Sequence, residues 1–305
     1  GRYGVALGAG ECCRQIAVEQ VCLVGAHADE AGGTVGVRIL WWRTVDVATV
    51  AGWRDTEATL TVIDARAERM FLRGHIPGAV FLDARNLNSS ADVARLLVTP
   101  DALGAILQDL GVSSGPVVVY GARGGSDGAH VWWTLDAMGV KDVWLLDGGI
   151  ESWIAAGLPV SEDPQSLTPA ISPLQMSPDS GAGIEIAEIR DRLGDDNLLM
   201  IDTRALEEFT GEDLLTDRGG HIPGAVLLPW DSLLTGDPQV LRPLEELQAD
   251  LAGAMDVAEV ATYCQSGVRA AHTYAVLKML GHPRPRLYLG SWEEWGNDAN
   301  VPIDQ

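Results

Sequence analysis

Two halves of this chain repeat the same landmarks in the same order, about 140 residues apart. Each half has a short apolar run that ends in Asp-x-Arg, at residues 62–66 and 200–204. Each half also carries His-Ile-Pro-Gly-Ala-Val, beginning at His75 and at His221. The other matched landmarks are residues 116–120 with 260–263, and residues 144–153 with 286–295. Four landmarks in register indicate a tandem duplication, so the chain must fold as two copies of one arrangement.

Each copy alternates short apolar strands with helices. In the second copy we expect strands at residues 198–203, 225–230, 260–263 and 287–290, and helices at 206–209, 244–251 and 270–280. Strands of four to six apolar residues with helices between them indicate a mainly parallel sheet. We therefore predict an α/β fold with two tandem domains, each a mainly parallel five-stranded sheet with helices on both faces.

The repeat also divides the chain. We expect a first domain at residues 45–160 and a second at residues 184–305, here called the first and second units. Residues 161–183 contain four prolines and several serines, which predicts a linker without regular structure. Residues 1–44 have no counterpart in the second unit, and we treat them as an N-terminal extension of unknown structure.

Charge and cysteine content narrow the possible partners. The net charge is −22 at pH 7, so nucleic acid and anionic membranes are unsuitable partners. No apolar run reaches the length of a membrane span, and we expect no secretory signal.

The four cysteines are Cys12, Cys13, Cys22 and Cys264. They form neither a disulfide framework nor a zinc-ligand pattern, so we expect a cytoplasmic protein with no metal and no cofactor.

Cys264 stands apart from the other cysteines. It ends the apolar run of residues 260–263, and a short loop with one glycine leads from it into the helix expected at residues 270–280. A strand–loop–helix of this kind directs backbone N–H groups and the positive helix end at one point. A thiol at that point becomes a thiolate near neutral pH and acts as a nucleophile. The pattern therefore predicts covalent chemistry on an anionic substrate.

The duplication, the paired HIPGA segments and the sequence Cys-Gln-Ser-Gly-Val-Arg at residues 264–269 together resemble the two-domain rhodanese sulfurtransferases. The resemblance covers roughly residues 45–300. It implies that each unit is a rhodanese-like domain and that only the second carries the catalytic cysteine. In agreement, the first unit has Gly121 at the position of Cys264. The first unit is then a scaffold beside the active site.

The resemblance implies transfer of a sulfane sulfur through a Cys264 persulfide. A small anionic sulfur donor loads the cysteine, and cyanide or a thiol such as glutathione or thioredoxin removes the sulfur. A loop of five residues would cradle the persulfide: Gln265, Ser266, Gly267, Val268 and Arg269. Gly267 permits the tight curl of the backbone, and Arg269 adds a forked cation.

Thiosulfate and 3-mercaptopyruvate are the two donors that the resemblance implies. We favour thiosulfate, because a cation in the loop favours the more highly charged donor. Candidate anion-binding residues are Arg204, Arg218 and Arg269, although Glu208 stands where the vertebrate thiosulfate type has a second arginine. We expect Trp230 to form a wall of the pocket.

Two other functions are alternatives to sulfur transfer, a cysteine phosphatase and a non-catalytic binding module. A cysteine phosphatase needs Cys-x5-Arg, whereas Cys264 and Arg269 are separated by four residues, and the shorter ring suits a sulfur atom. A non-catalytic rhodanese-like binding module would have little use for a loop that stabilises a thiolate. The duplicated His75 and His221 are expected to be structural, since only one copy has a cysteine.

Overall fold

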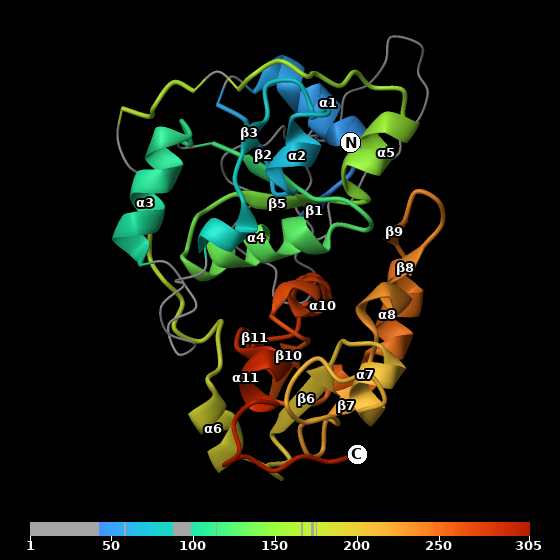
Figure 1. The fold of residues 1–305 in the computed structure, drawn as a ribbon. Helices are drawn as coiled ribbons and strands as arrows, with labels where there is room; N and C mark the ends of the chain where they lie inside the picture. The colour runs from blue at the N-terminus through green and yellow to red at the C-terminus, as the bar shows by residue number, and fades with distance from the viewer. Residues whose placement is uncertain are drawn as a thin grey trace, which may run out of the picture.

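The computed structural model describes residues 43–305 except 58, 88–98, 114, 166, 172–173 and 175, and Figure 1 shows its fold. The expected extension at residues 1–44 lies outside the described residues apart from Arg43 and Thr44. Cys12, Cys13 and Cys22 also lie outside them. Within the part of the chain that is described, we find no helix whose length and hydropathy would let it cross a membrane.

A five-stranded, all-parallel sheet forms the centre of the first unit, in the order β1-β5-β4-β2-β3. The strands are β1 (Thr44–Val45), β2 (Thr61–Asp64), β3 (Val80–Phe81), β4 (Val117–Tyr120) and β5 (Val143–Leu146). The helices are α1 (Val47–Thr56), α2 (Glu68–Phe71), α3 (Pro100–Asp109), α4 (Ser126–Ala137) and α5 (Gly149–Ala155), with the 3₁₀ helix η1 (Ala84–Leu87).

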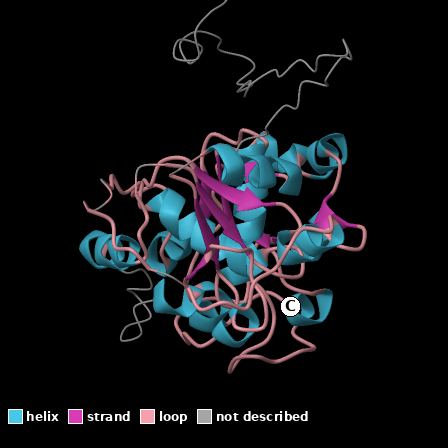
Figure 2. Cartoon of the chain, turned by 90° about the horizontal axis from the view of Figure 1, so that it is seen from above, coloured by secondary structure: helices cyan, strands magenta, loops and turns pink. Residues whose placement is uncertain are grey.

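Helices cover both faces of this sheet because its strands are apolar on both sides. Successive residues of a strand point to opposite faces. Val117 and Val119 of β4 accordingly pack with α3 and α4, whereas Val118 and Tyr120 pack with α1, α2 and α5. Figure 2 shows the strands enclosed by helices when the molecule is seen from above.

The second unit repeats this plan around a parallel sheet in the order β11-β10-β6-β7. Its strands are β6 (Leu198–Asp202), β7 (Val226–Leu227), β10 (Glu259–Tyr263) and β11 (Pro285–Leu287). Its helices are α6 (Ile186–Asp191), α7 (Leu206–Thr210), η2 (Trp230–Leu233), α8 (Leu244–Asp250), α9 (Ala252–Met255), α10 (Val268–Met279) and α11 (Ser291–Trp295). The pairing confirms the predicted fold class.

The strand count differs between the units. Where β1 pairs with β5 in the first unit, the second has a single parallel bridge between Gly183 and Leu287. Leu287 donates to the Ala182 carbonyl at 2.9 Å and accepts from the Ile184 amide at 3.1 Å. The prediction of a five-stranded sheet is therefore correct for the first unit and wrong for the second, whose parallel sheet has four strands and this bridge.

Some element boundaries were also predicted wrongly. The strand expected at residues 287–290 lies at residues 285–287. The strand expected at 225–230 shortens to β7, and a 3₁₀ helix begins at Trp230 directly after Pro229. Proline has no N–H to donate, so it cannot extend the ladder. The helix expected from residue 270 begins at Val268.

The two units meet through α4 and α10, the helices that follow equivalent loops (Figure 1). Tyr274 of α10 lies edge-on to Trp133 of α4 with ring centroids 6.3 Å apart. Lys278 of α10 forms a 2.7 Å ion pair with Asp136 of α4. Cys264, Ala271 and Tyr274 belong to the same apolar cluster as the α4 face of the first sheet. The units therefore share a core rather than only a polar contact.

A hairpin of the second unit, β8 (Leu234–Thr235) and β9 (Val240–Leu241), reaches across to the first unit. The Leu241 amide donates to Asp147 at 2.9 Å. A Cβ added to Gly124 would lie 2.3 Å from Leu234 Cδ1, so Leu234 packs directly on that backbone. The hairpin thus covers the loop that corresponds to the Cys264 loop.

The described residues of the segment 161–183 form no helix or strand but are attached to the first unit. Ser161 pairs with His75, the Ala170 amide donates to Gln108 at the end of α3, and the Asp179 amide donates to Ala137 at the end of α4. The described part of this segment therefore packs along the surface of the first unit as an extended chain.

Candidate active site

Cys264 directly follows β10, and only 1% of its surface is exposed. Its backbone is attached to the start of α11 on both sides. The Cys264 amide donates to Ser291 Oγ at 3.2 Å, and the Trp292 amide donates to the Cys264 carbonyl at 2.9 Å. The Glu293 amide donates to the carbonyl of Gln265 at 2.9 Å. These three bonds fix Cys264 at the carboxyl edge of the sheet.

Gly267 turns the chain from the loop into α10. Its φ is +83°, and an added Cβ would lie 2.6 Å from Leu289 Cδ1 and 3.1 Å from the Leu289 carbonyl oxygen. Both the backbone angle and the space therefore require glycine. Because the helix begins at Val268, Arg269 lies in the first helical turn and not in the loop.

The backbone N–H groups of residues 265–270 have no hydrogen-bond partner among the described residues. In the equivalent loop of the first unit, the Arg123 amide donates to Glu151 at 3.2 Å and the Gly125 amide donates to the Ala122 carbonyl at 3.0 Å. Buried N–H groups are almost always paired, with water or a ligand if not with protein. The second unit thus holds an open set of donors around its cysteine, next to a positive helix end.

Arg269 forms a two-bond ion pair with Glu208 of α7, at 2.7 and 2.8 Å. Burial opposes the charge of Arg269, but the hydrogen bonds from Glu208 and the negative charge of the Cys264 thiolate raise its pKa. Burial likewise opposes the charge of Glu208, but the bonds from Arg269 and from the Ala205 amide lower its pKa. Arg269 is therefore a cation beside Cys264 in the first turn of α10, with a carboxylate partner that the sequence did not predict.

The other two arginines are engaged elsewhere, so we remove both from the expected anion site. Arg204 is 1% exposed and bonds to Asp202 and to the Gly220 carbonyl at 2.7 Å. Arg66 binds Asp64 and Gly74 in the same way in the first unit, so the arrangement belongs to the fold. Arg218 donates to four backbone carbonyls near the C-terminus, those of Trp295, Gly296, Asp298 and Val301.

Trp230 lies at the start of η2 and packs edge-on against His272 of α10, with centroids 5.4 Å apart. Burial lowers the pKa of His272 to about 4, so the imidazole is neutral at physiological pH.

Two side chains of the loop after Cys264 differ in their surroundings: Ser266 is exposed, whereas Oε1 of Gln265 is buried without a hydrogen-bond partner among the described residues. The two expected structural histidines stack on phenylalanine, His75 on Phe71 and His221 on Phe209.

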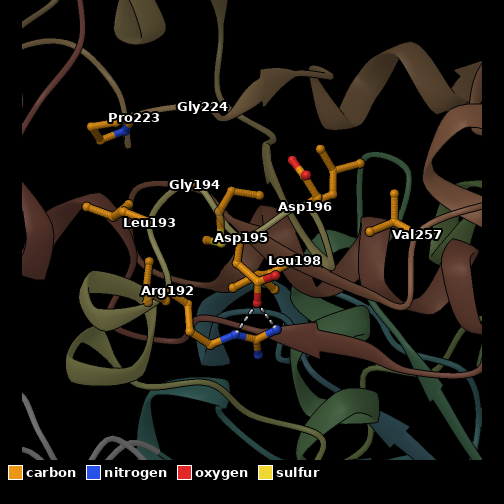
Figure 3. Close-up of a pocket in the computed structure, with 12 residues that line it drawn as sticks. Arg192, Leu193, Gly194, Asp195, Asp196, Leu198, Pro223, Gly224 and Val257 are labelled. Carbon is orange, nitrogen blue, oxygen red and sulfur yellow. Dashed lines mark hydrogen bonds and ion pairs between the residues drawn. The ribbon is translucent and has the colours of Figure 1, made fainter.

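A cavity of about 320 Å³ opens at the opposite edge of the second sheet, near Leu198 at the start of β6 (Figure 3). Its guanidinium, from Arg192, is bonded to Asp195, as the dashed lines in Figure 3 show, and also pairs with Glu188 and Glu259. Cys264 follows the carboxyl end of β10, so this cavity is separate from the cysteine site. The described residues contain no cluster of three or more His, Cys, Asp or Glu side chains suited to a metal ion.

The comparisons with known proteins agree with this geometry. The model of the Rhodanese-like domain matches residues 47–156 and 185–298. A probable 3-mercaptopyruvate sulfurtransferase of Pseudomonas aeruginosa is 36% identical over 82% of this chain and 94% of its own length. A thiosulfate sulfurtransferase of Azotobacter vinelandii is 33% identical over 80% of this chain and 91% of its own.

One similar solved structure is an anaerobic ergothioneine biosynthesis enzyme from Chlorobium limicola in complex with trimethyl histidine. It is 25% identical, with a TM-score of 0.78 over 86% of this chain and 70% of that chain. The family model covers both units, and the relatives align over most of the chain. This chain therefore belongs to the Rhodanese-like domain family and carries two copies of the domain.

Proposed function

We propose that this protein is a thiosulfate sulfurtransferase that carries sulfur as a persulfide on Cys264. The observation that supports this most directly is the set of unpartnered N–H groups at residues 265–270 beside a buried cysteine. Such donors stabilise negative charge in a site that excludes water. The matching loop of the first unit has Gly121 in place of the cysteine, and two of its N–H groups, those of Arg123 and Gly125, are bonded within that unit.

The reaction is a double displacement. The Cys264 thiolate attacks the outer sulfur of thiosulfate, a new S–S bond forms, and the original S–S bond breaks. Sulfite leaves with the electron pair, and the terminal sulfur of the persulfide keeps the negative charge. The N–H groups of the loop and of the first turn of α10 hold that charge. Cyanide then attacks the terminal sulfur, leaves as thiocyanate and restores the thiolate.

The Glu208–Arg269 pair favours 3-mercaptopyruvate as the second candidate donor. The carboxylate of Glu208 balances the charge of Arg269, so the site is less cationic than the sequence alone suggested. Thiosulfate carries two negative charges and gains more from an unbalanced cation than a monoanion does. Comparison of kcat/KM for the two donors decides between them, and a large preference for 3-mercaptopyruvate would replace our choice.

For the acceptor we propose a small nucleophile, either cyanide or a thiol such as glutathione or thioredoxin. Cys264 must remain free of disulfide bonds to act as a thiolate, which a reducing compartment ensures, so we propose a cytoplasmic location. Neither nucleic acid nor a membrane surface suits a chain with a net charge of −22.

Replacement of Cys264 by serine tests the mechanism. Incubation of the wild-type protein with thiosulfate should add one sulfur atom, about 32 Da, to the peptide that contains Cys264. The Cys264→Ser protein should show no adduct and no thiocyanate production from either donor. Cys264→Ser activity above a few per cent of wild type would overturn the proposal, since the covalent step needs this thiol.

A further inference from the structure

Ser291 has a backbone conformation that serine rarely adopts. Its φ is +53°, in the left-handed region that favours glycine, and none of its surface is exposed. The corresponding residue of the first unit is Gly149, with a φ of +58°. Both units thus have a left-handed residue at this position, although the preceding glycine differs, with a φ of −59° at Gly290 and +72° at Gly148. Only the unit with the cysteine has a side chain at the left-handed position.

The Ser291 hydroxyl has two partners. It donates to the Tyr288 carbonyl at 2.8 Å and accepts from the Cys264 amide at 3.2 Å. The bond to Tyr288 orients the hydroxyl so that a lone pair is available to Cys264. In this way the side chain connects the end of β11 to the nucleophile.

The first unit makes the equivalent backbone contact without a hydroxyl. The Ile150 amide donates to the Gly121 carbonyl at 3.1 Å, as Trp292 does to Cys264. A Cβ on Gly149 would lie 2.4 Å from the Gly121 carbonyl oxygen, so the turn there closes too tightly for a side chain. A left-handed serine is a strained residue, and such residues persist at functional sites when their surroundings hold them.

We propose that Ser291 is a positioning residue for the sulfur-transfer step. Its hydroxyl holds the amide of Cys264 on the side of α11, which keeps that amide out of the cradle and fixes the main chain from which Sγ projects. The thiolate and the persulfide then face the free N–H groups of residues 265–270. This inference rests on the proposed function, because it concerns how the same cysteine is aimed.

Two variants separate positioning from a structural role in the turn. Ser291→Gly removes the hydroxyl and relieves the strain, since glycine adopts a positive φ freely. Ser291→Ala removes the hydroxyl and keeps the strain. For each variant we would measure melting temperature, the single-turnover rate of Cys264 persulfide formation from thiosulfate, and the pH profile of Cys264 alkylation by iodoacetamide.

If Ser291 positions Cys264, both variants should form the persulfide about tenfold more slowly, the loss expected for one misaligned hydrogen-bonded group. In both variants the pH dependence of Cys264 alkylation should also shift to higher pH. These effects should be alike even though we expect Ser291→Gly to melt at a higher temperature than Ser291→Ala. If Ser291 only shapes the turn, Ser291→Gly should match the wild type in rate and profile while Ser291→Ala does not. That outcome, or a failure of both variants to fold, would overturn the inference. A wild-type protein that forms no adduct would instead refute the proposed function.

Discussion

Glu208 and Arg269 join α7 to the first turn of α10 through two hydrogen bonds of 2.7 and 2.8 Å, next to the catalytic loop. Only 6% of the Glu208 surface is exposed, so water and salt screen the charge of its carboxylate weakly. The ion pair sets both the position and the effective charge of the Arg269 guanidinium. Its two members therefore have distinct and testable effects on the choice of donor.

Glu208→Gln should raise the preference for thiosulfate over 3-mercaptopyruvate. The amide can still bond to Arg269 but no longer balances its charge, and the more highly charged donor gains more from the unbalanced cation. We expect the kcat/KM for thiosulfate, divided by the kcat/KM for 3-mercaptopyruvate, to rise about five- to tenfold. This factor corresponds to the attraction between the extra negative charge of thiosulfate and one unbalanced positive charge at an effective dielectric constant near 20. Glu207→Gln, on the exposed side of α7, is the matched control. An unchanged ratio would show that the pair does not control donor choice.

Arg269→Ala should be more harmful than loss of both partners. It leaves Glu208 buried without a counter-ion, which should cost about 3 kcal/mol in the free energy of unfolding and repel the donor. Glu208→Gln combined with Arg269→Met removes both charges and should recover most of the stability but not the rate. Urea unfolding and single-turnover persulfide formation measure the two effects. Equal stability of the single and double variants would contradict the buried-charge account.

The interface between the units should weaken at acid pH. His130 of α4 and His272 of α10 occupy equivalent positions, and burial lowers the pKa of each to about 4. Both ring nitrogens of His130 and Nδ1 of His272 are buried without partners, so no hydrogen bond stabilises the charged form. The unfolded chain binds protons near pH 6.5, before the folded protein does.

The contribution of the two neutral histidines to the free energy of unfolding is therefore fully present above about pH 6.5. It is lost as the pH falls through their pKa values in the folded protein, which are about 4. The expected loss is about 2–3 kcal/mol for each histidine at the lower limit. Unfolding curves between these two pH values measure it. His130→Leu should flatten the pH dependence, and an unchanged slope in that variant would remove His130 from the explanation.

Gly267→Ala should disturb the catalytic loop, whereas Gly281→Ala should not. The two glycines have nearly the same φ, +83° and +84°, but an added Cβ meets Leu289 at residue 267 and open space at residue 281. Both variants incur the strain of a left-handed alanine, about 1 kcal/mol. Gly267→Ala should lose a further 1–2 kcal/mol and most of the activity. Similar activities in the two variants would show that the crowding at Gly267 is relieved without moving the loop.

Much of this arrangement could be predicted from the sequence because the duplication supplies an internal comparison. The repeat located both units, placed Cys264 at the end of a parallel strand and identified Gly121 as its inactive counterpart. Arg66 and Asp64 recur as Arg204 and Asp202, but the recurrence alone left Arg204 a candidate for the anion site, and the matching ion pairs of the structure give it the same structural role as Arg66.

The missed features depend on contacts between distant segments. Glu208 and Arg269 are 61 residues apart, and a substitution at a family position does not reveal which cation the new carboxylate will meet. Arg218 meets its carbonyl partners 77 or more residues later in the chain. Ser291 did leave a signal, namely a serine where the first unit has Gly149, but its meaning required the backbone angle.

The surroundings of Gly121 leave no room for a cysteine in the first unit. A Cβ at this position would lie 2.7 Å from the backbone nitrogen of Gly128, inside α4. A single change from glycine to cysteine would therefore push the thiol's own backbone against the helix that forms the interface between the units. A second working site in this chain would therefore require α4, and with it the interface between the units, to move.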